Sequence, residues 1–289
     1  MKTPPALQHR TLGGFANRDV KFVSFNPRSD EQRRIHWKRF ERVRTGFYGR
    51  QTRQIGDALD EQLTFVLDNV RQSRRPASVP RAVQSATQRM TPILGDAVRS
   101  LYSQVVPTFA ELTVDAFPKG MYGPLWMKQD DDTWQNAATS YVRQNGGTLI
   151  SAPDAHTQKI LTTAAREATE MGLSLGWGIP QIADEIRARS QVAISQARAN
   201  RIARTEVIRA SNLGAMTGAR STGLLLDKEW IATADDRTRD THSAADQQIV
   251  HMEENFIVGG WPAMFPAAAS LPAEESVNCR CTVAFIPRR

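Results

Sequence analysis

Cysteine is the scarcest residue type in this 289-residue chain, which has two, Cys279 and Cys281. Two thiols at positions i and i+2 are not a disulfide framework, and a bridge between such close neighbours would be strained. We therefore expect free thiols or metal ligands, and a reducing compartment where the protein is made.

Long apolar runs are also missing. No stretch of about 18 apolar residues occurs, so we expect no membrane-spanning helix. The first residues, MKTPPALQHRTLGG, lack the apolar core of a secretory signal. Hydrophobic residues still make up 40% of the chain. With this length, that content predicts one large or two ordinary globular domains.

Charge is unevenly distributed along the chain. Residues 1–110 carry 19 Lys and Arg against 9 Asp and Glu, whereas the rest carries 18 against 21. A basic first part can meet nucleic acid or an acidic protein surface. The alternative is an arginine-rich helical face that contacts only solvent.

The first half of the chain is predicted to be helical after an extended arm at residues 1–30. Apolar residues spaced three and four apart from Phe40 to Val70 predict one long or broken amphipathic helix, with Gly46 and Gly49 as weak points. A second helix begins at Thr91 and should end or kink at Pro107.

Further along, FPKGMYGPLW (117–126) is predicted to be a loop because of its Gly and Pro content. A helix over 131–144 follows and should close at NGG (145–147). We place a domain boundary there, which divides the chain into an arm (1–30), a basic helical region (31–150) and a C-terminal module (151–289).

The module begins with predicted helices over 153–171, from Pro180 onward, and over 192–218. Three short strands are then expected at 224–234, 255–259 and 281–286. The fold class is therefore α+β, with a mainly helical N-terminal region and a smaller helix-plus-antiparallel-sheet module.

Three stretches of the module carry candidate chemistry. ARTEVIRASNLG (203–214) places Arg204, Glu206, Arg209 and Asn212 on a helix, where the alternative is an ordinary surface face with polar pairs. ATADDRTRDTHSAAD (232–246) gathers carboxylates, guanidinium groups and an imidazole in one loop. The alternative for this loop is a salt-bridged brace.

The third stretch is NCRC (278–281). Cys279 and Cys281 could bind zinc together with His242 and a further ligand such as His251 or Asp246. Two buried free thiols at the start of a strand are the alternative. A nucleophilic Cys279 assisted by His242 can be drawn, but the sequence has no phosphate-binding loop and no HExxH pattern. It also offers no nucleophile elbow of the GxSxG kind, since GLSLG (172–176) follows a predicted helix and not a strand.

Taken in order, ARTEVIRASNLGAM, KEWIATADDRTRDTH, FIVGG, a Pro-rich loop and EESVNCRC resemble the phage head morphogenesis family, the Mu F-like minor head proteins. The resemblance covers roughly residues 150–289. Members often show Asp-Gly shortly after the His, where this chain has Asp246 and Gln247. Matched by position, the family's recurring residues are Arg204, Thr205, Glu206, Asn212, Trp230, Asp235, Arg237, Arg239, His242, Asn278, Cys279, Arg280 and Cys281.

The resemblance implies a minor component of a tailed-phage head, made in the host cytoplasm, with no known catalysis. Its implied partners are the portal protein, the major capsid or scaffolding protein, and packaged double-stranded DNA, with no membrane. The DNA-facing candidates are Arg33, Arg34, Lys38, Arg39, Arg42, Arg44, Arg74, Arg75 and Arg81. The second hypothesis is a metal-dependent hydrolase or nuclease that uses His242, Asp235, Cys279 and Cys281.

Overall fold

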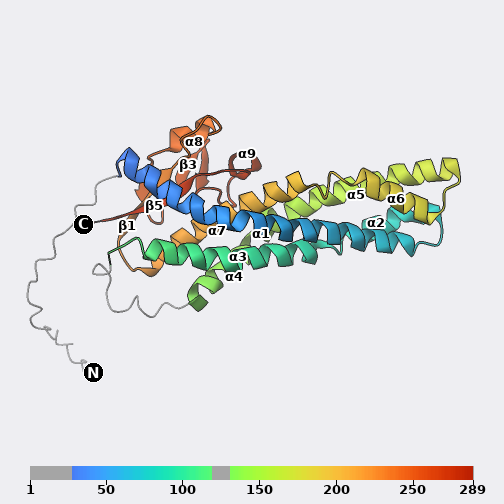
Figure 1. The fold of residues 1–289 in the computed structure, drawn as a ribbon, viewed down its shortest axis with the longest axis horizontal. Helices are drawn as coiled ribbons and strands as arrows, with labels where there is room; N and C mark the ends of the chain where they lie inside the picture. Colours follow the sequence, from blue (N-terminus) through green and yellow to red (C-terminus); the bar gives the residue numbers. More distant parts are fainter. Residues whose placement is uncertain (1–27, 119–130, 289) are drawn as a thin grey trace, which may run out of the picture.

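The computed structural model describes residues 28–118 and 131–288. It shows a long helical body that carries a small group of strands at one end (Figure 1). The predicted arm, apart from its last three residues, and most of the predicted 117–126 loop lie outside the described residues.

The helix α1 (Asp30–Arg71) runs along the helical body (Figure 1). Ser29 caps it, and Gln32 completes a reciprocal capping box. Gly46 and Gly49 do not interrupt it, since its apolar face is buried from Phe40 to Val70. After the basic cluster come the 3₁₀ turn η1 (Pro76–Ser78) and α2 (Val79–Thr87).

The helix α3 (Thr91–Val114) continues past Pro107. The prediction that the helix could end at this proline is therefore wrong. Proline has no N–H and therefore leaves the carbonyl of Ser103 without its helical donor. The side-chain amide of Gln135 donates to this carbonyl at 2.9 Å. A neighbouring helix thus supplies the bond that proline cannot make.

The chain between residues 131 and 175 has no loop. The helix α4 (Asp131–Gly146) passes into a π-helical turn, η3 (Gly147–Ser151), and then into α5 (Ala152–Leu175). The predicted closure at NGG is wrong, because burial of Leu149 and Ile150 holds the next turn in place. The domain boundary predicted there stays a prediction.

The helices α6 (Ile179–Arg189) and α7 (Gln196–Ser221) complete the helical body. Two glycines of α7 allow α3 to lie close against it. A Cβ at Gly214 would lie 2.4 Å from the carbonyl oxygen of Val106, and one at Gly218 would lie 2.3 Å from that of Ala110. Only residues without a side chain fit at this crossing.

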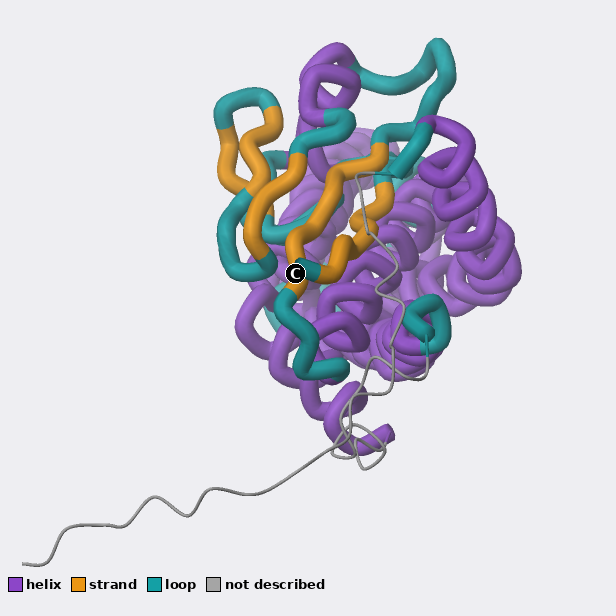
Figure 2. Tube along the Cα trace, turned by 90° about the vertical axis from the view of Figure 1, so that its left-hand side faces the viewer, coloured by secondary structure: helices purple, strands orange, loops and turns teal. Residues whose placement is uncertain are grey.

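The strands confirm the predicted α+β class (Figure 2). The strand β1 (Leu226–Ile231) lies between β2 (Ile249–His251) and β5 (Thr282–Pro287), antiparallel to both. A separate hairpin joins β3 (Phe256–Val258) to β4 (Trp261–Ala263). The short helices α8 (Asp240–Ala245) and α9 (Ala273–Ser276), with β2 and β4, were not predicted.

The first helix also contacts the last strand and the residues just before it. His36 lies 3.1 Å from the carbonyl oxygen of Val283, and the indole N–H of Trp37 donates to the carbonyl of Arg280 at 3.0 Å. Residues from both halves of the chain, such as Phe109 and Trp230, share one apolar core.

Candidate metal centre

The segment before β5 directs two thiols to one side. Cys279, Arg280 and Cys281 lead directly into β5, and alternate residues of extended chain point to opposite faces. Both cysteines are accordingly buried and unbridged. Arg280 points the other way and forms a two-pronged ion pair with Asp235. The CxC spacing therefore presents two sulfur atoms together.

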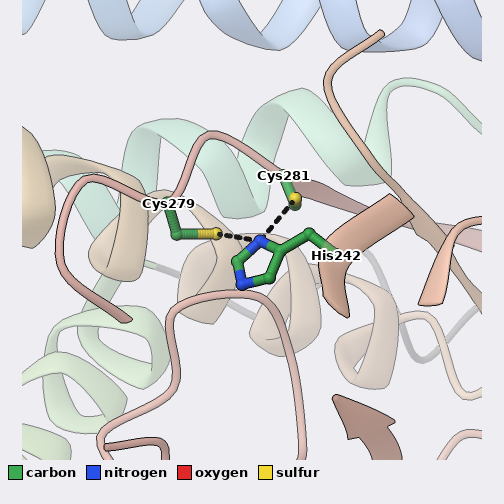
Figure 3. Close-up of side chains that lie close together, drawn as sticks. All are labelled: His242, Cys279 and Cys281. Carbon is green, nitrogen blue, oxygen red and sulfur yellow. Dashed lines mark hydrogen bonds between the residues drawn. The ribbon is translucent and has the colours of Figure 1, made fainter. Parts of the chain in front are cut away.

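The imidazole of His242 lies between these sulfur atoms. Its Nδ1 atom is 3.3 Å from Cys281 Sγ and 3.7 Å from Cys279 Sγ, and both sulfurs point at this one nitrogen (Figure 3). The three potential ligand atoms all lie within 4.8 Å of one another. His242 comes from α8 and is 2% exposed. Among the described residues, this group has the composition of a metal site.

The other ring nitrogen of His242 faces a carboxylate. His242 Nε2 lies 3.0 Å from Glu275 Oε2, which also accepts from the Thr241 hydroxyl at 2.8 Å. Glu275 lies so close to the β3–β4 turn that a Cβ at Gly259 would be 2.4 Å from its Oε1 atom. Gly259 also has a φ of 56°. The VGG of the sequence thus makes room for this carboxylate.

The pKa values of the two thiols are shifted in opposite directions. The hydrogen bond with Cys281 and the adjacent His242 outweigh burial and hold the pKa of Cys279 well below its usual range. Burial, followed by the neighbouring Cys279, raises the pKa of Cys281 well above its usual range. Burial lowers the pKa of His242, but the contacts with Cys279, together with the charge of Glu275, raise it by more. The protein environment therefore favours at least one thiolate beside the imidazole.

A buried cation from α1 lies close to this group. Arg44 is completely buried and donates to Ser211 Oγ at 2.8 Å, to Asn212 Oδ1 at 3.3 Å and to the carbonyl of Cys281 at 3.4 Å. Its Nη1 atom has no hydrogen-bond partner. Arg44 was predicted to face DNA, and its burial rules that out.

Asn212 bonds to the same segment of chain as Arg44. Its amide donates to the carbonyl oxygens of Cys281 and Pro266, and its oxygen accepts from the backbone N–H of Val283. Nearby, Arg209 pairs with Glu206, which accepts from Tyr102 at 2.9 Å. These buried bonds exclude an ordinary surface face for this part of α7, although Arg204 itself is exposed over the ring of Tyr48.

The comparisons with known proteins agree with this arrangement. The family described as Phage Mu protein F like protein matches residues 163–284, which include the three residues of the metal group and Glu206, Arg209 and Asn212 of α7. Residues 163–284 are therefore similar to this family, and we call them the Mu F-like module. The predicted resemblance is thereby confirmed.

Two curated proteins are similar to part of this chain. The minor head protein GP7 of Bacillus phage SPP1 is 34% identical over 123 residues, which is 41% of this chain and 39% of that protein. The NAD(+)–arginine ADP-ribosyltransferase EFV of Enterococcus faecalis is 37% identical over 114 residues, which is 38% of this chain and 23% of that protein. The matches thus span less than half of either relative, and no solved structure matches.

The loop of the Mu F-like module does not bring all of its predicted residues to the metal group. Asp235 pairs with Arg280, which holds the pKa of that carboxyl well below its usual range. Arg237 is exposed, and Arg239 donates to the carbonyl of Val277 at 2.6 Å. Asp235 and Arg239 therefore brace the loop against the chain that precedes β5, whereas Arg237 pairs with Asp235 inside the loop.

Neither proposed fourth ligand belongs to the metal group. His251 is bonded to Asp227 at 2.7 Å. Asp246 pairs with Arg33 and accepts from the backbone N–H of Ala232. The adjoining Gln247 keeps the left-handed backbone, with a φ of 65°, at the place where family members often have glycine.

Trp230 and Asn278 also shape the module. Trp230 is fully buried, with its ring edge-on to His242 at 5.8 Å between centroids. Asn278 has a φ of 56°, and its backbone N–H donates to Thr205 Oγ1 at 3.1 Å. The turn at Asn278 joins α7 to the cysteine segment.

The candidate DNA-facing residues form two exposed groups, with Arg33 and the buried Arg44 as exceptions. Arg33 is buried and paired with Glu229 and Asp246, so it is not free to meet a phosphate. The others are exposed and lie near the start of α1 or beyond its end: Arg34, Lys38, Arg39, Arg42, Arg74, Arg75 and Arg81. A helix rises about 1.5 Å per residue, so about 50 Å separates the two groups.

Sequence reasoning missed Glu275 and misassigned Arg44. Glu275 is adjacent to Glu274, and nothing in the sequence distinguishes the buried carboxylate from the exposed one. One sequence feature could have indicated that Arg44 is buried. It directly follows the apolar Val43, on the side of the helix that packs against the rest of the protein.

Proposed function

We propose that this protein is a minor head protein of a tailed phage, which docks at the portal or the inner capsid surface during head assembly. The proposal rests on the Mu F-like module and its similarity to a protein named as a minor head protein. The proposed partners are the portal protein and the major capsid or scaffolding protein. The proposed location is the head interior near the portal.

The structure supports a role as a rigid connector. The long helices give the described body two distant ends, and α1 is bonded into the module at Arg44, His36 and Trp37 (Figure 1). No described helix has the length and apolar character needed to cross a membrane. An elongated, rigid body of this kind can bind one partner at each end and keep the two partners at a fixed distance.

We further propose that the exposed basic residues at the two ends of α1 contact packaged DNA. Phosphate contacts of this kind are independent of sequence and weaken steeply with salt. Two separated basic groups would engage different stretches of duplex. This contact would accompany the docking role and not replace it.

A hydrolase or nuclease role has weaker support. Asp235, which this hypothesis places in the site, pairs with Arg280 and is not part of the metal group. The pocket of about 550 Å³ beside the loop is lined by Asp30, Trp37 and Asp235 among others, but not by His242 or the cysteines. The transferase name belongs to a relative of which this chain matches 23%.

Quantitative mass spectrometry of purified particles tests the proposal. We expect a few copies per head, equal to or fewer than the portal subunits. Comparison of filled heads with heads that have ejected their DNA shows whether the protein leaves with the genome. Absence from particles that contain all other head proteins would overturn the proposed function.

A further inference from the structure

We propose that His242, Cys279 and Cys281 bind one zinc ion, which cross-braces the Mu F-like module. The three side chains come from α8 and from the segment just before β5, and they are brought together by the fold. All three are at most 2% exposed. The proposal does not rest on the protein's role in the phage head.

The atomic spacing fits a tetrahedral ion. With Zn–S bonds of about 2.3 Å and Zn–N bonds of about 2.0–2.1 Å, a tetrahedron separates nitrogen from sulfur by about 3.5 Å. The observed distances from His242 Nδ1 are 3.3 Å to Cys281 Sγ and 3.7 Å to Cys279 Sγ. An ion placed between the three atoms therefore needs only small side-chain shifts.

The ligand chemistry selects zinc among the common divalent cations. Thiolate and imidazole are soft or intermediate ligands, which suit zinc and do not suit magnesium or calcium. Two thiolates also neutralise the charge of Zn²⁺. No fourth His, Cys, Asp or Glu among the described residues joins the group, so a small ligand such as water would complete the tetrahedron.

The surrounding groups fit the outer contacts of a metal site. A metal-bound histidine usually gives its other ring N–H to a carboxylate, which orients the ring. Glu275 lies 3.0 Å from His242 Nε2 and is itself held by Thr241. Nδ1 faces the sulfur atoms and is placed to bind the metal, whereas Nε2 is placed to donate its proton to Glu275.

A further buried donor lies beside the sulfur atoms. The indole N–H of Trp230 is buried near Cys281 and has no hydrogen-bond partner. A buried donor without a partner is costly. A metal-bound thiolate would supply an acceptor for it. Arg44 contacts the same segment through the carbonyl of Cys281 at 3.4 Å, and its Nη1 atom lies 3.9 Å from Glu41 Oε2.

Metal analysis of the full-length protein, purified under reducing conditions without added metal or chelator, tests the proposal. We expect about one zinc per chain. After zinc removal, one Co²⁺ per chain should bind and give the thiolate-to-cobalt charge-transfer band. The cobalt titration uses the unaltered protein, so it does not depend on whether variants fold.

Matched variants locate the site. Cys281→Ser and His242→Gln should lose the metal or bind it at least tenfold more weakly, whereas His251→Gln and Glu274→Gln should keep it. Circular dichroism reports whether each variant is folded. Protein that holds no zinc and binds no Co²⁺ when reduced would overturn the proposal, as would undiminished binding by folded Cys281→Ser and Cys279→Ser.

Discussion

Arg44, from the first helix, lies 3.3 Å from the side-chain oxygen of Asn212, which is 168 residues later in the chain. The same Asn212 oxygen accepts from the backbone N–H of Val283 in β5. A charge from the N-terminal half of the protein is therefore part of the hydrogen-bond network at the centre of the Mu F-like module.

Replacing Arg44 with Met should destabilise the protein by about 2–4 kcal/mol, because several buried acceptors lose a charged donor. The free energy of unfolding, measured with urea, checks this. Arg42→Met, two residues away on the exposed side, should change it by at most about 0.5 kcal/mol. Equal small effects would contradict the structural role of Arg44.

Gly218→Ala should destabilise the α3–α7 crossing. A Cβ there would lie 2.3 Å from the carbonyl oxygen of Ala110, which is backbone and cannot turn away. We expect a loss of about 2–4 kcal/mol in the free energy of unfolding. Gly46→Ala is the control: the added Cβ would have no neighbour within 4 Å. This substitution should stabilise α1 by about 0.5–1 kcal/mol. A neutral Gly218→Ala would show that the helices are not so close.

His36 should make the protein less stable in mild acid. Burial, together with Arg28, Arg44 and Arg39, lowers its pKa to about 3, from an ordinary value of 6.5. Between these values the unfolded chain binds the additional proton, so this stability is present above about pH 7 and is lost as pH falls. The loss should reach up to about 2 kcal/mol at pH 5.

Urea unfolding at pH 7 and pH 5 measures this effect, with His36→Gln as the test variant. The variant should lose less stability than the unaltered protein over this interval. His156→Gln is the control, because His156 is exposed and its pKa is lowered with less burial. An identical pH dependence in all three proteins would rule out His36 as the source.

DNA binding, if it uses the basic cluster after α1, should depend on salt. Replacing Arg74, Arg75 and Arg81 with Gln should weaken binding uniformly across sequences. It should also reduce the slope of log K against log salt by about 3, close to one for each lost phosphate contact. Arg237→Gln, an exposed arginine in the module, is the control. An unchanged slope would remove this cluster from the interface.

Glu275 should matter for metal affinity through its contact with His242. Glu275→Gln should weaken zinc binding by about 10–100-fold, the usual effect of losing such an outer contact. Competition with a chromophoric chelator measures the affinity. Glu274→Gln changes an exposed neighbour and should have no effect. Equal affinities for the two variants would show that the carboxylate does not orient the ring.

The order of the module's elements could be predicted from sequence because its signals are local. The apolar run at β5, and the alternation that turns both cysteines to one side, depend on neighbouring residues alone. The family's order of motifs then identified the residues of the network. His242 and the two cysteines could be grouped by ligand chemistry before their distances were known.

Other features depend on contacts that sequence spacing does not contain. Pro107 is tolerated because Gln135, from another helix, reaches the carbonyl it exposes. The sequence alone does not distinguish Arg44 from the exposed arginines near it, because its burial results from packing against α7. The short strands β2 and β4 have three residues each, and their stability comes from pairing with other strands more than from their own composition.

The bonds from α1 to the last strand have an evolutionary consequence. A fragment limited to residues 163–284 would leave the carbonyls of Arg280 and Val283 and the side chain of Asn212 without partners that α1 supplies. The segment similar to the family therefore depends on α1 for part of its hydrogen bonding. We expect recombination to yield a folded protein only when this segment is exchanged together with the helix that packs against it.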